Sequence, residues 1–334
     1  MAQPSSVQVL VPIAGTNITI QYKNENLIGD AVAPVVPVYS PATKILKYSK
    51  ANMFMLQDDD LWYEEGGEVK VFNYDIESQT VNPRFIASGE DVYDTVKDVA
   101  AMPGQMPLQP DIDAVQHAFK KQDLKKELLV SQAVYGNTWS DGTNGGSAPS
   151  AGAGAWALDT TANSFVKDIY AAKASILGKT GQKPNTLVLD YGTFIAQQFN
   201  PVVADKIKYT QRGVITADLL ASLLQLDEVL VGEAIYTSAN QNKKATSASF
   251  TGTQIWSPSG IDKGNAFLYY RGTPGLRVVS ALFQFRLPVM GQMRYVRSYR
   301  IEPKALLRYE VKEKIDMAVL ATDVGWAWKT TIKA

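Results

Sequence analysis

The sequence predicts an α+β fold, and residues 183–238 are the basis of this prediction. Residues 186–189 and 228–232 are short runs of mostly aliphatic side chains bounded by turn residues, which is typical of buried strands. Helices fit between these runs, because Asn200-Pro201 ends one helix and Thr216 can cap another. Two strands with helices between them form a compact core of the α+β or α/β type.

The helices of this stretch are short and apolar on one side. Phe194 and Ile195 lie in the first, a further turn fits residues 202–207, and Gly213 permits a reversal. Residues 217–224 follow with an apolar stripe, which predicts packing on the core. The stripe consists of Leu219, Leu220, Leu223 and Leu224.

Length and composition are those of a globular protein without net charge. A chain of 334 residues suffices for about two domains, and 46% hydrophobic residues fit a buried core. The 33 basic and 33 acidic residues cancel, which argues against binding nucleic acid by bulk electrostatics. There is no cysteine, no signal-peptide pattern and no apolar window long enough for a membrane span. We therefore expect a soluble product of the cytoplasm.

Residues 1–50 combine short apolar runs with five prolines and no sustained helical period. Two interpretations stay open. The segment is either an extended arm that packs on something outside its own domain, or a set of edge strands in an ordinary domain.

Residues 51–97 contain an acidic cluster beside a hairpin signal. Gly66-Gly67 precedes the alternating run 68–72, which predicts a hairpin with the acidic residues at its solvated end. The charged residues of this hairpin are Asp58, Asp59, Asp60, Glu64, Glu65 and Lys70. Adjacent aspartates lack the spacing of a calcium loop, so no metal site is predicted.

Residues 109–134 form the first long helix, which Pro110 starts. Its apolar residues fall on two sides, so we expect it to touch two surfaces or to bend near Gln122. His117, the only histidine, lies in this helix without a serine, cysteine or aspartate at a catalytic spacing. We interpret it as structural or exposed.

Residues 136–155 hold six glycines and little to bury after Trp139, which predicts a flexible surface loop. Asp159 or Thr160 caps the next helix, and Gly178 stops it. One face of that helix is apolar, so we expect it to pack on the strand at 186–189. The face consists of Phe165, Ile169, Ala172 and Ile176.

Gly178-Lys179-Thr180 resembles the end of a phosphate-binding loop only superficially. Lys173 occupies the place of the required first glycine, and a helix rather than a strand precedes the segment. No nucleotide site is predicted.

The last third of the chain predicts strands at 253–256 and 266–270 and one long terminal strand from 309 to 328. Tyr295 and Tyr299 alternate with arginines, which fits either nucleic-acid stacking or a strand whose charged face is balanced by glutamates. We favour the second interpretation. The arginines are Arg286, Arg294, Arg297 and Arg300.

The central stretch also contains short motifs in a fixed order. They read PNTLVL at 184–189, KIKYTQRGVIT at 206–216, LLASLL at 219–224, VLVGEAIYTSA at 229–239 and IWSP at 255–258. This series resembles the central domain of tailed-bacteriophage major capsid proteins. Asn200 stands where that family usually has histidine, and Ser257 where it usually has glycine.

The resemblance implies the Hong Kong 97-type capsid fold. Its regions would be an N-terminal arm (1–50), an extended β-hairpin loop (51–97), a peripheral domain (98–184) with a spine helix (109–134), an axial domain (185–285) and a return to the peripheral domain with C-terminal strands (286–334). The loop would reach over a neighbouring subunit, which would make its charged residues intersubunit contacts.

The same resemblance implies a structural role without a cofactor. Copies of the chain would form hexamers and pentamers of an icosahedral shell around double-stranded DNA, assembled in the host cytoplasm and found in the virion. Scaffolding, portal and decoration proteins would be further partners. Two alternatives remain: an encapsulin-type compartment of the same fold, and an α/β enzyme, for which the sequence shows no convergent polar groups.

Overall fold

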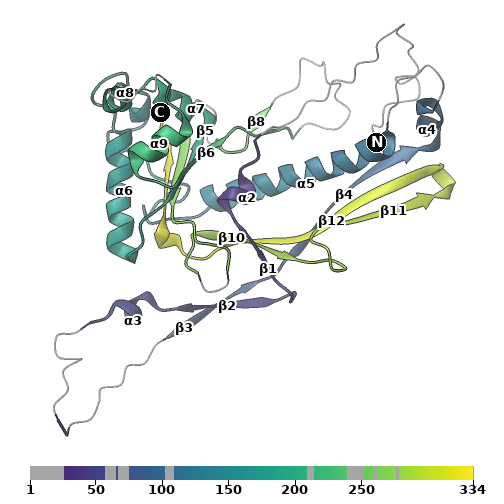
Figure 1. The fold of residues 1–334 in the computed structure, drawn as a ribbon, viewed down its shortest axis with the longest axis horizontal. Coiled ribbons are helices and arrows are strands. Elements are labelled where there is room, and N and C mark those ends of the chain that lie inside the picture. Colours follow the sequence, from purple (N-terminus) through teal and green to yellow (C-terminus); the bar gives the residue numbers. More distant parts are fainter. Residues whose placement is uncertain are drawn as a thin grey trace.

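The computed structural model describes residues 26–56, 65–66, 75–101, 109–208, 214–238, 252–258, 260, 262–275 and 278–333 (Figure 1). Its α-helices are α2 (Gly29–Val32), α3 (Lys50–Phe54), α4 (Asp94–Ala100), α5 (Pro110–Tyr135), α6 (Phe165–Thr180), α7 (Tyr191–Gln198), α8 (Pro201–Ile207) and α9 (Ala217–Leu224). Its strands are β1 (Val35–Pro37), β2 (Thr43–Tyr48), β3 (Ile76–Val81), β4 (Arg84–Tyr93), β5 (Thr186–Asp190), β6 (Glu228–Gly232), β7 (Ile235–Tyr236), β8 (Thr253–Gln254), β9 (Asn265–Tyr269), β10 (Leu282–Leu287), β11 (Tyr295–Ile301), β12 (Leu306–Val319) and β13 (Gly325–Lys329). Short 3-10 turns lie at Ala155–Ala157, Glu302–Lys304 and Thr322–Val324.

The compact part of the molecule is built on the four-stranded sheet β13-β9-β5-β6. The parallel pair β5 and β6 confirms the two strands expected at residues 186–189 and 228–232. Leu187 and Leu189 of β5 face the core covered by α6, α8 and α9, whereas Val188 faces a second core. Both faces of the sheet are therefore buried, which explains why β5 reads as a continuous aliphatic run.

The short helices of the compact part have side-chain caps, and the sequence predicts the one at Thr216. The Thr216 hydroxyl accepts a hydrogen bond from Leu219 N at the start of α9, and the Asn200 side chain accepts one from Val202 N at the start of α8. Leu220 and Leu224 of the leucine stripe are fully buried.

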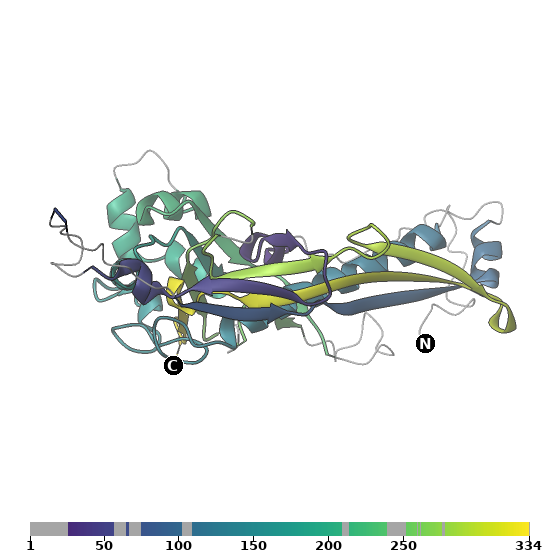
Figure 2. The same cartoon turned by 90° about the horizontal axis from the view of Figure 1, so that it is seen from below.

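The elongated part consists of a second sheet and α5. β12 pairs antiparallel with β10, β11 and β4, while β1 adds a parallel edge strand to β10. α5 lies along one face of β4 and β12, and Figure 2 shows the resulting long, narrow layer. Two small residues, Ala114 and Ala118, let the helix approach the strands, and Gln122 Nε2 donates to Val311 O at 2.7 Å.

The helix expected at 109–134 is confirmed, and it touches two surfaces. Its first half packs on the elongated sheet, and Val130 and Val134 in its second half enter the core between the two sheets. No helix in the described ranges is both long and apolar enough to cross a membrane.

Residues 26–38 differ from the predicted arm, because the structure packs them inside their own subunit. Val32 and Ala33 are fully buried, and β1 pairs with β10. The alternative interpretation, an edge strand, describes this segment correctly. The contacts come from residues almost 250 positions away, as in Val35 with Gln284, so no local pattern could show them.

The glycine-rich segment 136–155 is fastened to the body rather than free. Ser140 N donates to Gly325 O, and Ser147 N and O both bond to the backbone of β13. Gly146 has φ +104°, and a Cβ there would lie 2.9 Å from Ala327 C. Glycine at this position therefore permits the two backbones to approach closely. Composition alone does not distinguish this role of glycine from chain flexibility.

Two further boundaries differ from the prediction. α6 starts at Phe165 after Ser164 and continues through Gly178 to a left-handed stop at Gly181. The expected single strand from 309 to 328 is two strands, β12 and β13, which turn apart at Thr322–Val324. β13 pairs with β9 in the compact part, whereas the sequence assigned this end of the chain to the peripheral domain.

Candidate functional site

The β2–β3 ribbon, together with α3, projects from the body of the molecule (Figure 1). Ile45 and Val81 fasten its base, because they are buried in a small core with Val36, Phe283 and Phe285. Lys47 Nζ also donates to Leu320 O at 2.5 Å, and Gln79 Nε2 to Val319 O at 3.2 Å. The base of the ribbon is therefore fixed to the junction of β10 and β12.

The other face of the ribbon is apolar and exposed. Side chains alternate along a strand, so Leu46 and Tyr48 point away from Ile45, and the register places Ile76 opposite Tyr48. Four successive apolar side chains that follow β2 in the chain are exposed as well. The ribbon surface then consists of Leu46, Tyr48, Met53, Phe54, Met55, Leu56 and Ile76, with exposed fractions from 45% to 73%.

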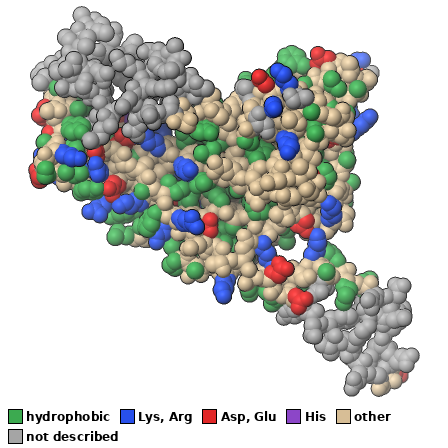
Figure 3. Space-filling model, turned by 180° about the vertical axis from the view of Figure 1, so that it is seen from behind, with side chains coloured by type: hydrophobic (Ala, Val, Ile, Leu, Met, Phe, Trp, Pro, Cys, Tyr) green, Lys and Arg blue, Asp and Glu red, His purple; other side chains and the backbone are tan. Residues whose placement is uncertain are grey.

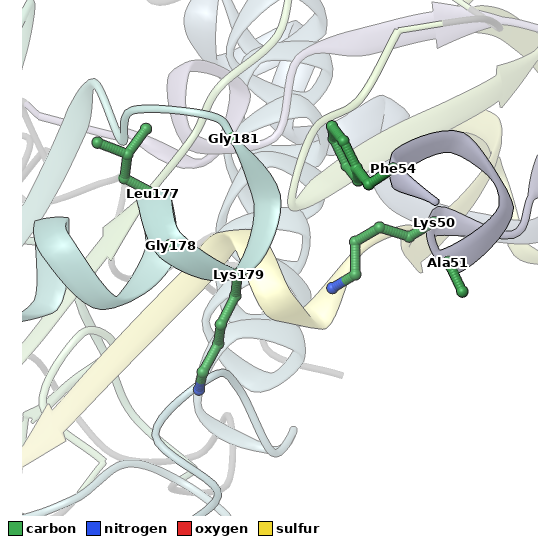
Figure 4. Close-up of a pocket in the computed structure, with 7 residues that line it drawn as sticks. All are labelled: Lys50, Ala51, Phe54, Leu177, Gly178, Lys179 and Gly181. Atoms are coloured by element: carbon green, nitrogen blue, oxygen red, sulfur yellow. The ribbon is translucent and has the colours of Figure 1, made fainter. Parts of the chain in front are cut away.

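α3 lies close to the end of α6 and leaves an open groove between them. Figure 4 shows Phe54 and Lys50 of α3 facing Leu177, Lys179 and Gly181. The groove has no buried polar group among its lining residues, and its two lysines are engaged elsewhere: Lys50 with Asp323 at 2.5 Å, and Lys179 with Ser140 O at 2.8 Å. It continues the apolar ribbon surface rather than forming a separate ligand site.

A projecting ribbon of this kind lacks sufficient contacts of its own. A two-stranded ribbon is marginal in water unless another layer covers one face. Clustered exposed apolar side chains on a soluble protein mark interaction surfaces. The ribbon surface is consequently the candidate functional site of the described residues.

The arginines of the last third are charge-balanced. Arg286 pairs with Asp30 at 2.8 Å, and Arg300 pairs with Asp94 at 2.7 Å. Arg297 lies over the Tyr299 ring at 4.9 Å from its centroid. Figure 3 shows acidic and basic side chains interspersed over the face it presents. This arrangement favours the charged strand face over nucleic-acid stacking.

The Glu313 carboxylate on β12 is 1% exposed and lies among three cations. Its oxygens are 3.2 Å from Arg286 Nε, 3.3 Å from Arg294 Nε and 3.8 Å from Lys126 Nζ. Asp123 of α5 also pairs with Lys126 at 2.8 Å and with Arg294. Burial alone would raise the pKa of Asp123, but hydrogen bonds from Lys126 and Arg294 outweigh it and lower the pKa. Removing one partner would leave a buried charge unpaired, so the cluster fixes α5 on the sheet.

Most of the predicted contact residues lie outside the part of the chain that the structure describes. Asp58, Asp59, Asp60, Glu64 and Lys70 lie outside the described residues, and Glu65 is exposed in a turn with Gly66 at φ +93°. These contacts stay a prediction. His117 lies exposed on α5, as one of the two interpretations expected. In the part of the chain that the structure describes, no group of three acidic or histidine side chains is placed to hold a metal ion.

Sequence reasoning missed the ribbon surface. Residues 44–48 do not alternate regularly between charged and apolar side chains. Ile45 and Leu46 are adjacent, and they lie on opposite faces of the strand. The four apolar residues 53–56 were a usable signal, since such a run next to acidic residues is unusual for a solvated turn.

Comparisons with known proteins support the resemblance. No model of a known protein family matches the sequence. The major capsid protein of Burkholderia phage BcepMu is 27% identical over 242 residues, which are 71% of this chain and 73% of the relative. The crystal structure of a phage-related protein from Bordetella bronchiseptica RB50 has a TM-score of 0.64 at 21% identity and covers 93% of this chain and 94% of its own.

The fold is that of the Hong Kong 97-type phage capsid proteins. The capsid structure of Cyanophage P-SCSP1u covers 98% of both chains with a TM-score of 0.60 at 10% identity. The encapsulin complex of Synechococcus elongatus PCC 7942 has a TM-score of 0.52 at 12% identity and covers 99% of this chain and 97% of its own. The fold is thus shared by phage shells and by a protein compartment, and the resemblance found in residues 184–258 is confirmed.

Proposed function

We propose that the chain is the major capsid protein of a tailed bacteriophage. The observation that carries the proposal is the sequence similarity to the BcepMu major capsid protein, because it spans 73% of that protein while the fold agrees over nearly the whole chain. Copies of the chain would assemble in the host cytoplasm into hexamers and pentamers of an icosahedral shell. That shell would enclose double-stranded DNA and take up scaffolding, portal and decoration proteins.

The ribbon surface supports self-assembly. A closed ring needs heterologous contacts, in which one surface of a subunit meets a different surface of the next. The ribbon is fixed at its base by Ile45 and Val81 and apolar on its outer face, so it is preformed to lie on a neighbouring copy. The hairpin residues Asp58, Asp59, Asp60, Glu64, Glu65 and Lys70 would contact the same neighbour.

Electron microscopy of the purified protein tests the proposal. Closed icosahedral particles are the expected result, and single subunits under all conditions of salt and concentration would contradict it.

The encapsulin alternative is favoured by one observation, the likeness to the Synechococcus compartment. Particles that contain a cargo protein and no DNA after expression with the neighbouring genes would support that alternative.

Substitutions on the ribbon surface test the contact. Phe54→Ser and Leu56→Ser are expected to leave the melting temperature almost unchanged, because both side chains are more than 60% exposed. Both should strongly reduce the yield of closed particles. Leu158→Ser, at 41% exposure in the compact part, is the matched control. If the ribbon variants assemble as well as the control, the ribbon surface is not an assembly contact.

We also propose that the chain catalyses no reaction. His117 is exposed on α5. His117→Ala is expected to leave particle formation intact, and turnover of any substrate that this substitution abolishes would contradict the proposal.

A further inference from the structure

Residues 26–34, called the strap below, lie across the junction between the compact and the elongated part. Figure 1 shows α2, the helix of the strap, beside the end of α5 where the two parts meet. Ile28, Val32 and Ala33 are buried in a core that contains Phe267 of the compact sheet and Leu282 of the elongated sheet. The strap therefore contacts both sheets at once.

Polar contacts hold the strap to the compact part. The Tyr269 hydroxyl of β9 donates to Val32 O at 2.9 Å, and Arg271 NH1 donates to Ala31 O at 3.1 Å. At the start of the strap, Asn26 Nδ2 donates to a Glu233 oxygen at 2.5 Å. These partners come from two places in the compact part, the end of β9 and the residue after β6.

A second set of polar contacts holds the strap to the elongated part. Asp30 Oδ1 accepts from Gln284 Nε2 and from Arg286 NH2, both at 2.8 Å. Gln284 N also donates to Pro34 O at 3.1 Å, before β1 continues the strap as an edge strand. One segment of nine residues is thus bonded to both sheets.

Glu127 of α5 holds the start of α2. Its carboxylate is 2% exposed and accepts from Ile28 N at 2.9 Å, from Gly29 N at 2.6 Å and from Trp256 Nε1 at 2.6 Å. The first N–H groups of a helix have no partner within the helix, so the carboxylate satisfies two donors that α2 cannot. Trp256 belongs to the compact part, so Glu127 joins α5, the strap and the compact part in one place.

The chain passes between the two parts only as irregular segments within the described residues: after α5, between β9 and β10, and between β12 and β13. Among the described helices and strands, α5 reaches from the elongated sheet into the core shared with the compact part, where Ser131 Oγ donates to Ile255 O at 2.6 Å. Apolar contacts in the shared core are non-directional, so they permit small rotations that directional hydrogen bonds resist. We propose that the strap fixes the angle between the compact and the elongated part, with Glu127 as the positioning residue that keeps the strap in place.

The proposal concerns the single subunit and goes beyond self-assembly. Its importance for a shell rests on the proposed function, because the angle between the parts decides how each subunit meets its neighbours. A failure to find particles would contradict the proposed function and leave the strap untouched, so the two are tested separately.

The angle is measured with two spin labels. The natural chain has no cysteine, so Gln116→Cys on α5 and Lys167→Cys on α6, both exposed, give one label in each part. If the protein associates, diluting the labelled chain with unlabelled chain ensures that each measured distance joins the two labels of one subunit. In this background, Glu127→Ala and the milder Tyr269→Phe are expected to broaden the distance distribution. Hydrogen exchange of the peptide 26–34 should become about tenfold faster in Tyr269→Phe, the effect of one lost buried hydrogen bond. It should become faster still in Glu127→Ala, which removes three.

Asp168→Asn is the matched control. The Asp168 carboxylate is also buried and also accepts from an indole, Trp156 Nε1 at 2.7 Å, but its other partners, Ser164 and Ser150, lie in the compact part as well. It should lower the melting temperature without broadening the distance distribution. An unchanged distribution in both strap variants, or equal broadening in the control, would overturn the proposal. Tyr269→Phe decides the matter if Glu127→Ala does not fold.

Discussion

Three buried carboxylates take hydrogen bonds from backbone, indole and hydroxyl groups, and each joins separate segments of the chain. Asp190 accepts from Thr193 N at 3.0 Å and Asn265 N at 3.2 Å, which joins the start of α7 to β9. Asp168 holds the loop around Trp156, and Glu127 holds the strap. Burial raises the pKa of Asp190 and of Glu127, although the hydrogen bonds act in the opposite direction.

The raised pKa of Glu127 predicts a pH dependence. The folded chain binds this proton more tightly than the unfolded chain does, so the associated stability is fully present below the unfolded pKa of about 4.3 and is lost as pH rises through the folded value. Glu127→Gln removes this titration. The melting temperature of the wild type should therefore exceed that of the variant most at acid pH. This difference should decrease toward neutral pH. A difference that is constant with pH would contradict the prediction.

Among the elements, those whose signals are local could be predicted from the sequence. α8 and α9 have their caps at Asn200 and Thr216, and β5 is a buried aliphatic run, so a few neighbouring residues determine each of them. The ends of α6 were predicted less well, because Gly178 has no φ above zero and the left-handed stop falls at Gly181.

Elements that depend on distant partners could not be predicted. β1 is an edge strand that pairs with β10, and β13 is an edge strand that pairs with β9. Neither strand has a sequence pattern that identifies its partner. The ribbon surface was missed for a related reason: exposure of an apolar side chain is decided by what lies next to it in space. Leu46 and Ile45 are neighbours in sequence, yet one is 58% and the other 6% exposed.

α9 allows a test of the compact core. Leu220 is fully buried between α6 and β6, so Leu220→Asp places a charge where it has no partner and should cost about 3–5 kcal/mol. We expect loss of the cooperative melting transition of the compact part by circular dichroism. Ser222→Asp, on the exposed side of the same helix, is the matched control. A soluble Leu220→Asp variant with an unchanged melting temperature would show that the stripe does not hold the core.

At the scale of the whole molecule, three parts extend in different directions. The compact part and the elongated part share a core, whereas the ribbon leaves the body at the end of β12 (Figure 1). Burial of Ile45 and Val81, which are 6% and 0% exposed, and hydrogen bonds from Lys47 and Gln79 hold the ribbon's base. If that base is sufficient, the segment between Leu56 and Asp75 is dispensable for folding.

Deleting residues 58–68 and joining the ends with a short Gly-Ser linker tests this separation of folding from assembly. The base contacts of Ile45 and Val81 remain, so the melting temperature should change by no more than a few degrees. Closed particles should disappear in negative-stain microscopy, because the proposed contact between subunits is removed. Replacing the same residues with a Gly-Ser segment of equal length separates the length of the loop from the chemistry of its side chains: loss of particles in both variants assigns the contact to side chains of residues 58–68. A deletion variant that still closes normal particles contradicts the proposed contact, and one that fails to fold shows that these residues belong to the subunit's own core.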